Sequence, residues 1–190
     1  MAGLRERKKL TTRQALGRAA LRLALERGPA QVRREDIAAE VDVSLRTFSN
    51  YFESKEEAIV SLAVDRAADL LEALRARPAD EPLRSALSTV FTLPYADQPP
   101  SRERVAQLRL VVSEPEMQGA YLKAMAGVER RLAEVIAARL GVAAGELRPR
   151  VLAAAACGAE RVAIGVWLSA ADPQPLPTLI RAALSEVIPA

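Results

Sequence analysis

Histidine is absent from this chain of 190 residues, and cysteine occurs once, at Cys157. Without histidine the chain lacks the commonest general base and the commonest metal ligand, which excludes Ser-His-Asp and Cys-His catalysis and most zinc sites. A single cysteine cannot form an intrachain disulfide, as is typical of a protein from a reducing compartment. Cys157 lies in an alanine-rich run, so we expect it to be a small core residue.

The sequence also lacks a glycine-rich phosphate loop and an apolar signal segment at its start. Its acidic pairs, Glu35-Asp36 and Glu56-Glu57, lie in the first turns of expected helices, where carboxylates favour the positive end of the helix dipole. We therefore expect no enzyme activity, no cofactor and no metal site. The longest late apolar run, residues 162–171, is too short to cross a bilayer, so we expect a cytoplasmic protein without a membrane partner.

Half of the residues are apolar, with abundant alanine and leucine and little strand-like alternation. This composition predicts an all-α fold, with about nine helices and room for one or two cores. Charge is distributed unevenly, because residues 1–55 hold 12 Lys plus Arg against 7 Asp plus Glu. Their net charge is +5 and that of residues 56–190 is −2. A basic N-terminal third is typical of a domain that meets a polyanion.

The segment from residue 35 to residue 57 is the most informative part of the chain. Ile37 and Val41 form an apolar stripe on one short helix, and Asp42 can adopt the left-handed backbone of a tight turn. Ser44 has the side-chain oxygen of a helix N-cap, and Phe48 on the next helix can pack back on the first. The pattern favours a helix-turn-helix that binds DNA, although an ordinary helix pair with a solvated polar face remains an alternative.

The outward face of the second helix carries groups that can pair with base edges and phosphates in the major groove. The residues expected to contact bases or nearby phosphates are Arg46, Thr47, Ser49 and Asn50. Those expected to contact the DNA backbone are Arg33, Arg34, Ser44, Tyr51 and Lys55. A basic N-terminal arm with Arg5, Arg7, Lys8, Lys9 and Arg13 could follow phosphates, or could be a solvated tail.

The same residues resemble the DNA-binding domain of the TetR family of bacterial transcriptional regulators. The matching motifs are Asp36-Ile37-Ala38, Val43-Ser44, Thr47-Phe48, Tyr51-Phe52 and Ser54-Lys55-Glu56. The chain departs at Arg33 and Arg34, where the family usually has Thr and an apolar residue, and at Ser49, where an aromatic is frequent. The resemblance covers about the first third closely and implies an all-helical homodimer with an effector-binding domain.

Helix signals continue along the rest of the chain. The first helix is expected to begin at Thr11 or Thr12, with Gln14 in a capping-box position, and to end before Gly28-Pro29. Further helices are expected at about 54–77, 83–93, from 101, and at 115–140, 147–171 and 176–188, with a loop at 94–100. Ser54-Lys55-Glu56-Glu57 forms an expected capping box at the start of the first of these, and Gly141 and Gly145 are expected to end the helix at 115–140. We expect two domains, residues 1–55 for DNA binding and residues 56–190 for ligand binding and dimerisation.

The resemblance also implies a small-molecule pocket between the middle helices and a dimer interface on the last two. Large adaptable side chains suit a pocket for apolar ligands, although each is more often plain core. The candidates are Phe91, Tyr95, Leu110, Met117, Tyr121, Met125 and Trp167. For the dimer interface, which could instead be intrachain core, they are Gly158, Val162, Leu179, Ala183, Leu184 and Val187.

The sequence therefore predicts a homodimeric regulator, a repressor that leaves its palindromic operator when a small hydrophobic effector binds. Elements at 109–110, 113–115 and 147–150, with Trp167, resemble actinobacterial regulators thought to sense acyl-CoA-like ligands. Two alternatives remain open. One is a nonspecific DNA-binding protein, and the other is a helical small-molecule binding protein without specific DNA binding.

Overall fold

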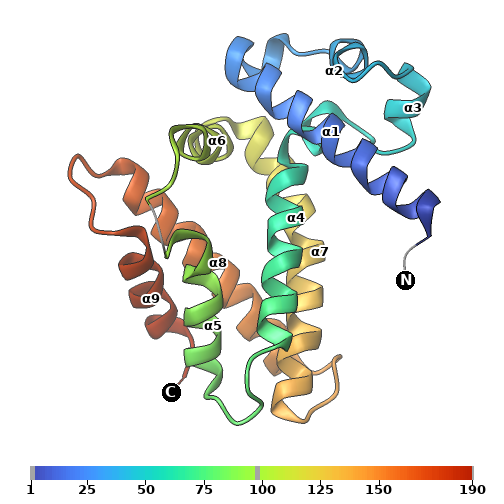
Figure 1. Cartoon of the computed structure of the whole chain (residues 1–190). Coiled ribbons are helices and arrows are strands. Elements are labelled where there is room, and N and C mark those ends of the chain that lie inside the picture. Colours follow the sequence, from blue (N-terminus) through green and yellow to red (C-terminus); the bar gives the residue numbers. More distant parts are fainter. Residues whose placement is uncertain (1–2, 97–98, 190) are drawn as a thin grey trace. The chain divides into compact units, whose positions relative to one another are not determined.

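The computed structural model describes residues 3–96 and 99–189, which form nine α-helices, two short 3₁₀ helices and no strand (Figure 1). The all-α prediction is confirmed. The helices are α1 (Leu4–Arg27), α2 (Arg34–Glu40), α3 (Leu45–Ser49), α4 (Lys55–Arg75), α5 (Leu83–Thr92), α6 (Arg102–Ser113), α7 (Pro115–Leu140), α8 (Leu147–Ser169) and α9 (Leu176–Val187), with η1 (Pro29–Gln31) and η2 (Leu93–Tyr95).

The chain divides into two compact units. The first unit comprises Met1–Asp65 and Arg109–Ala124, and the second comprises Arg66–Leu108 and Met125–Ala190. These units differ from the domains expected at 1–55 and 56–190. The start of α4 places Ala58 and Ile59 in the core of the first unit, and the start of α7 adds Met117. Long helices thus pass from one core to the other, which a division of the sequence at one point does not capture.

The first helix begins earlier than predicted, because α1 extends to Leu4. The hydroxyl of Thr11 donates to the carbonyl oxygen of Arg7 at 2.9 Å, and that of Thr12 donates to the oxygen of Lys8 at 3.0 Å. Both threonines therefore bond back to the preceding turn inside a helix instead of capping its start. The predicted basic arm is correspondingly helical from Leu4 onward, and the expected start at Thr11 is wrong.

The helix-turn-helix has the predicted local geometry. Gly28 ends α1 with a φ of 80°, a conformation that favours glycine. Asp42 lies between α2 and α3 with a φ of 54°, and among the described non-glycine residues it alone has a positive φ. The turn prediction at Asp42 is confirmed, and its cause is the short polar side chain, which tolerates the left-handed backbone.

The helix α4 begins at a cap that differs in one detail from the predicted capping box. Ser54 Oγ accepts a hydrogen bond from the backbone N–H of Glu57 at 3.1 Å, as expected. The carboxylate of Glu57 accepts from the backbone N–H of Glu53 at 2.7 Å, one residue before the predicted position. Both bonds satisfy amide groups that helix formation leaves without partners at this end.

The second unit builds its core mainly from α4, α5, α7, α8 and α9, with Tyr95 of η2 and Leu108 of α6. Gly141 ends α7 with a φ of 67°, and the N–H of Val142 donates to the carbonyl oxygen of Ala137 at 3.1 Å. This pair of features is a glycine C-cap, as the sequence indicated. In the predicted loop at 94–100, η2 occupies the start, and residues 97–98 lie outside the described residues.

The apolar part of helix α8 is longer than the run at residues 162–171 on which the sequence argument relied. Its 23 residues are long and apolar enough to cross a membrane by length and composition, so the argument from that shorter run was wrong. A core helix of a soluble protein passes the same test. In the second unit α8 packs along α9, and its buried side carries Leu152, Ala156 and Ile164. This packing accounts for the buried residues of α8, which make up 33 % of its apolar window.

Candidate nucleic-acid interface and apolar cavity

The helix α3 is short, and its position depends on one cap and two aromatic side chains. Ser44 Oγ accepts from the backbone N–H of Thr47 at 3.1 Å and lies 2.9 Å from the Thr47 hydroxyl. Phe48 is 0 % exposed and Phe52 is 2 % exposed, with their ring centroids 5.7 Å apart. A five-residue helix is not stable alone, so burial of Phe48 in the core of the first unit holds it.

The polar residues predicted to contact bases lie on the outer side of this helix. Arg46, Ser49 and Asn50 are exposed, and Thr47 is half-buried. Their groups offer guanidinium, hydroxyl and amide hydrogen bonds, which suit base edges and phosphates. We call the exposed residues Arg46, Ser49 and Asn50, at α3 and its C-cap, the recognition face.

Three of the five residues predicted to contact the DNA backbone, Arg33, Arg34 and Lys55, lie near one another at the starts of α2 and α4, whereas Ser44 precedes α3 and Tyr51 follows it. A shallow depression is lined by Arg33, Arg34, Glu35, Glu53, Ser54, Lys55 and Glu56. The two arginines are exposed, and the carboxylate of Asp36 accepts from the backbone N–H of Arg33 at 3.0 Å. Two exposed guanidinium groups beside a helix start can bind phosphate oxygens.

Lys55 has an intrachain role that the sequence did not indicate. Its Nζ donates to the carbonyl oxygen of Pro29 at 2.8 Å and lies 3.4 Å from that of Ala30, and the side chain is half-buried. An ammonium has three donors, and these bonds use two of them. Lys55 thus ties the start of α4 to η1, which leaves little of its donor capacity for a phosphate.

Arg13 is likewise engaged within the first unit. Its Nη1 lies 2.6 Å from Oδ1 of Asp65, and its guanidinium lies 5.1 Å from the ring centroid of Phe52. These contacts join α1, α4 and the segment after α3. Arg7, Lys8 and Lys9 are exposed on the first turns of α1, whereas Arg13 is bound to other residues of the unit. Sequence reasoning missed the Arg13–Asp65 pair, because 52 residues separate its members.

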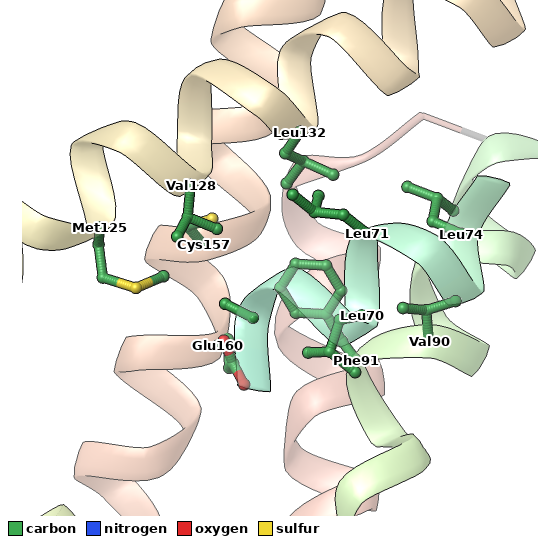
Figure 2. A pocket seen from close by; sticks show the side chains of 11 residues that line it. Leu70, Leu71, Leu74, Val90, Phe91, Met125, Val128, Leu132, Cys157 and Glu160 are labelled. Atoms are coloured by element: carbon green, nitrogen blue, oxygen red, sulfur yellow. The ribbon is translucent and has the colours of Figure 1, made fainter. Parts of the chain in front are cut away.

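An apolar cavity lies within the second unit, between α4, α5, α7 and α8 (Figure 2). The space open to the centre of a water molecule is only about 20 Å³, which holds about one water. A larger ligand therefore requires its walls to move apart. The lining residues are Ala67, Leu70, Leu71, Leu74, Val90, Phe91, Met125, Val128, Leu132, Cys157 and Glu160.

Glu160 is the one charged residue in this lining. Burial among apolar side chains raises the pKa of its carboxyl to about 7, and the positive charge of Arg104 partly opposes that shift. Burial also raises the pKa of the neighbouring Cys157 thiol, which stays protonated. Sequence reasoning missed Glu160. The feature that could have indicated it is an acidic residue one turn after Cys157, in a stretch of α8 made otherwise of small, apolar residues.

The predicted pocket residues divide between the two units. Phe91 and Met125 line the cavity, and Tyr95 and Trp167 pack in or against the core of the second unit without lining it. Three others, Leu110, Met117 and Tyr121, belong to or pack against the core of the first unit. The sequence could not separate these groups, since one face of α7 supplies both cores in succession.

The predicted dimer residues also divide into two classes. Leu184 is 0 % exposed in the core of the second unit, so it is intrachain core and not a surface residue. Leu179 and Ala183 are partly buried against the same core. Val162 is 56 % exposed and Val187 is 42 % exposed. Gly158 lies half-buried on the same side of α8 as Val162, one turn away.

Comparisons with known proteins agree with this arrangement. Residues 17–60 match the tetR family of bacterial regulatory proteins, and residues 77–190 match the MftR C-terminal domain of TetR-type regulators. The chain belongs to the TetR family. It is also 37 % identical over 180 residues to the transcriptional regulator TcmR of Streptomyces glaucescens, covering 90 % of this chain and 79 % of TcmR. The chain is therefore a TetR-family transcriptional regulator.

Solved TetR-family structures share the fold. The FadR repressor of Thermus thermophilus, solved in complex with lauroyl-CoA, superposes with a TM-score of 0.60 at 19 % identity and 92 % coverage of both chains. The fatty acid degradation regulator FadR of Bacillus halodurans gives a TM-score of 0.54 at 20 % identity, covering 93 % of this chain and 94 % of that one. At these identities the similarity establishes the fold.

Proposed function

We propose that this TetR-family regulator is a repressor whose α3 reads a palindromic operator and which a small hydrophobic effector releases. The observation that supports DNA reading is the combination of a capped, aromatic-anchored α3 with an exposed polar recognition face. Rigid anchoring fixes the direction of side chains that must meet base edges, and their exposure leaves them free to do so. We infer a cytoplasmic location from the family and this role.

The proposed DNA contacts follow from exposure and from the donors that remain available. Arg46, Ser49 and Asn50, with Thr47 at their edge, contact bases or adjacent phosphates. Backbone contacts come from Arg33 and Arg34, with Ser44 and Tyr51 beside the recognition face. Lys55 is expected to act chiefly by fixing the start of α4, because its ammonium already binds two carbonyl oxygens.

The proposed dimer surface is the exposed side of α8 with the end of α9. Leu147, Val151, Val162 and Val166 are 76 %, 54 %, 56 % and 53 % exposed. Their spacing places them along one side of α8, with Gly158 between them allowing close approach of a second helix. A two-fold dimer doubles the number of bases that a short recognition face can contact, which requires a palindromic operator.

The proposed effector site is the apolar cavity of the second unit. The complex of the Thermus thermophilus FadR with lauroyl-CoA supports an acyl-CoA-like compound as one candidate effector. Ten of the eleven lining residues carry no charge, as expected for a site that takes an apolar body. Release follows if the effector binds more tightly to a DNA-incompetent conformation than to the DNA-bound one.

Selection of bound duplexes from a random pool at near-physiological salt tests this function. We expect a palindrome with two half-sites to be enriched, and Arg46→Ala to lose that preference. Arg150→Ala is a matched control, because Arg150 is an exposed arginine of the second unit. Enrichment without sequence preference would support a nonspecific DNA-binding protein, and no enrichment would support a small-molecule binding protein.

A further inference from the structure

The cavity contains a carboxyl group that the proposed repressor function does not use. Glu160 extends from α8 into a lining otherwise made of uncharged, mostly aliphatic side chains (Figure 2). Across the described part of the chain, residues 3–96 and 99–189, its carboxyl forms no hydrogen bond or ion pair with another side chain or backbone group. The residue as a whole is half-buried, and a carboxyl among mainly apolar groups is stabilised by a partner that donates a hydrogen bond to it.

Arg104 is near enough to influence Glu160 through its charge, but its guanidinium is bound elsewhere. Its Nη1 donates to Oε1 of Gln107 at 2.7 Å, and its Nη2 lies 3.4 Å from the Tyr95 hydroxyl. Gln107 and Tyr95 are both buried, so these contacts fix the guanidinium on groups other than the carboxyl. The lone pairs of Glu160 therefore remain available to a hydrogen-bond donor that enters the cavity.

We propose that the effector is an apolar molecule carrying a hydrogen-bond donor, an ammonium or a hydroxyl group, that binds the carboxyl of Glu160. This inference rests on the proposed effector site in the cavity. The aliphatic walls take the apolar body, and the carboxyl selects for a donor and against an anionic head group, so it disfavours an acyl-CoA-like effector. A ligand that ends in a carboxylate would place two acidic groups together in a poorly solvated space, where like charges repel strongly.

The ionisable groups around Glu160 predict how binding depends on pH. The arginines of this cluster are Arg104 on α6 and Arg66 on α4, and burial raises the pKa of Tyr95 in η2 and of Cys157 on α8, so both stay neutral between pH 6 and pH 8. The walls from α4 and α5 are aliphatic or aromatic at the cavity, and α7 adds Glu129, which acts on Cys157. Within this set Glu160, with a pKa of about 7, changes its charge in this range.

An ammonium ligand should therefore bind more tightly as the pH rises. At pH 6 roughly a tenth of Glu160 is ionised, and at pH 8 roughly nine tenths, given a pKa of about 7. Affinity for an alkylammonium should rise by about tenfold across this range, since the amine stays protonated throughout. Affinity for an alcohol should change far less, because a hydroxyl can pair with either form of the carboxyl.

The test compares three ligands with the same ten-carbon chain, decylamine, decanol and decanoate, all below their aggregation limits. Binding is followed by fluorescence of Trp167, the single tryptophan, which packs against the core of the second unit. We expect decylamine or decanol to bind at least tenfold more tightly than decanoate. A stronger effect for decylamine identifies an ammonium ligand, and a stronger effect for decanol identifies a hydroxyl ligand.

The variant Glu160→Gln removes the charge and keeps the side-chain shape. It should reduce the preference for decylamine over decanoate to less than threefold and abolish the pH dependence. Glu134→Gln is the matched control, because Glu134 is exposed on α7 in the same unit, and it should behave as the wild type. Thermal melting of both variants verifies that they fold.

Equal or tighter binding of decanoate overturns the proposal, as does an unchanged preference in Glu160→Gln or the failure of all three ligands to bind. These results leave the repressor function standing if the duplex selection yields a palindrome. Failure of that selection together with a Glu160-dependent preference would instead retain the ligand site and reject DNA reading. The two proposals therefore fail separately.

Discussion

The two compact units use buried aromatic side chains for different purposes. In the first unit Phe48 is wholly buried and fixes a five-residue helix whose polar side stays exposed. In the second, Phe91 is almost as buried, but it borders a cavity that contains one carboxyl. The comparison indicates that the first unit is suited to present a fixed surface, and that the second has a small cavity with one carboxyl group, which can receive a ligand when its walls move apart.

The largest expected effect comes from removing these two aromatic rings in turn. Phe48→Ala should lower the free energy of unfolding by about 3–5 kcal/mol and abolish specific DNA binding, because α3 loses its anchor. Phe91→Ala should enlarge the cavity and alter ligand binding. Chemical denaturation gives the stabilities, and amide hydrogen exchange locates the loss in one unit or the other. If Phe48→Ala reduced protection from hydrogen exchange equally in both units, Phe48 would not act on the first unit alone, and the contrast between the units would fail.

The pH dependence of stability should distinguish the second unit from the first. The folded pKa of Glu160 is about 7, raised from an ordinary value of 4.5. The folded protein therefore holds this proton more tightly, so Glu160 favours folding most below about pH 4.5, and that contribution is lost as the pH rises through about 7.

The variant Glu160→Gln should accordingly gain stability relative to the wild type between pH 4.5 and pH 7, by up to about 3 kcal/mol. Urea denaturation of both proteins at each pH measures this difference, and titration of the other carboxyl groups cancels in the comparison. A difference that stays constant over this pH range would show that the carboxyl is as well solvated in the folded state as in the unfolded chain.

Variants of Arg46 and Lys55 should distinguish contact with DNA bases from stabilisation of the first unit. Arg46→Ala should cost about 1–3 kcal/mol of binding to a selected duplex with little change in stability. Lys55→Ala should lower stability by about 1–2 kcal/mol, because the carbonyl oxygens of Pro29 and Ala30 lose a charged donor. Its DNA binding should weaken similarly on all sequences.

Fluorescence anisotropy with selected and unrelated duplexes, over a series of salt concentrations, measures both effects. A smaller salt dependence in Lys55→Ala would assign the lysine a direct phosphate contact. Unchanged stability in that variant would contradict the supporting role that the two carbonyl contacts indicate.

The smallest expected effect concerns the cap of α3. Ser44→Ala should lower stability by about 1 kcal/mol, because the N–H of Thr47 loses its acceptor. Ser49→Ala is a matched control, since Ser49 is exposed at the other end of the same helix. Thermal denaturation should show a lower midpoint for the first variant alone. Equal midpoints would mean that Phe48 by itself holds the helix.

Much of the fold followed from local signals. The turn at Asp42, the cap at Ser44 and the glycine ends at Gly28 and Gly141 depend on residues a few positions apart, and the structure agrees with each. The early start of α1 did not follow, since Thr11 resembles a cap when its bond to the Arg7 carbonyl is unknown. A threonine hydroxyl can cap the start of a helix or bond to the preceding turn inside one, and which of these occurs depends on where the helix begins.

The candidate sites were less predictable where they depend on distant contacts. Exposure of Arg46 and Asn50 followed from the periodicity of a short helix. The contact of Lys55 with Pro29 did not, and neither did the placement of Met117 in the core of the first unit and of Met125 at the cavity of the second, although two turns of α7 separate them. Periodicity gives the buried side of a helix but not the element that covers it.

The sequence by itself determined the helical class, the DNA-reading motif and the family, because these depend on residue types at short, regular spacings. Only the tertiary structure decided where α4 and α7 pass from one core to the other, and which of the large side chains meet around a cavity. It also decided that, among residues 3–96 and 99–189, no group donates a hydrogen bond to Glu160. The pKa of Glu160 depends on the groups that distant segments bring near it, and these have no fixed spacing in the sequence.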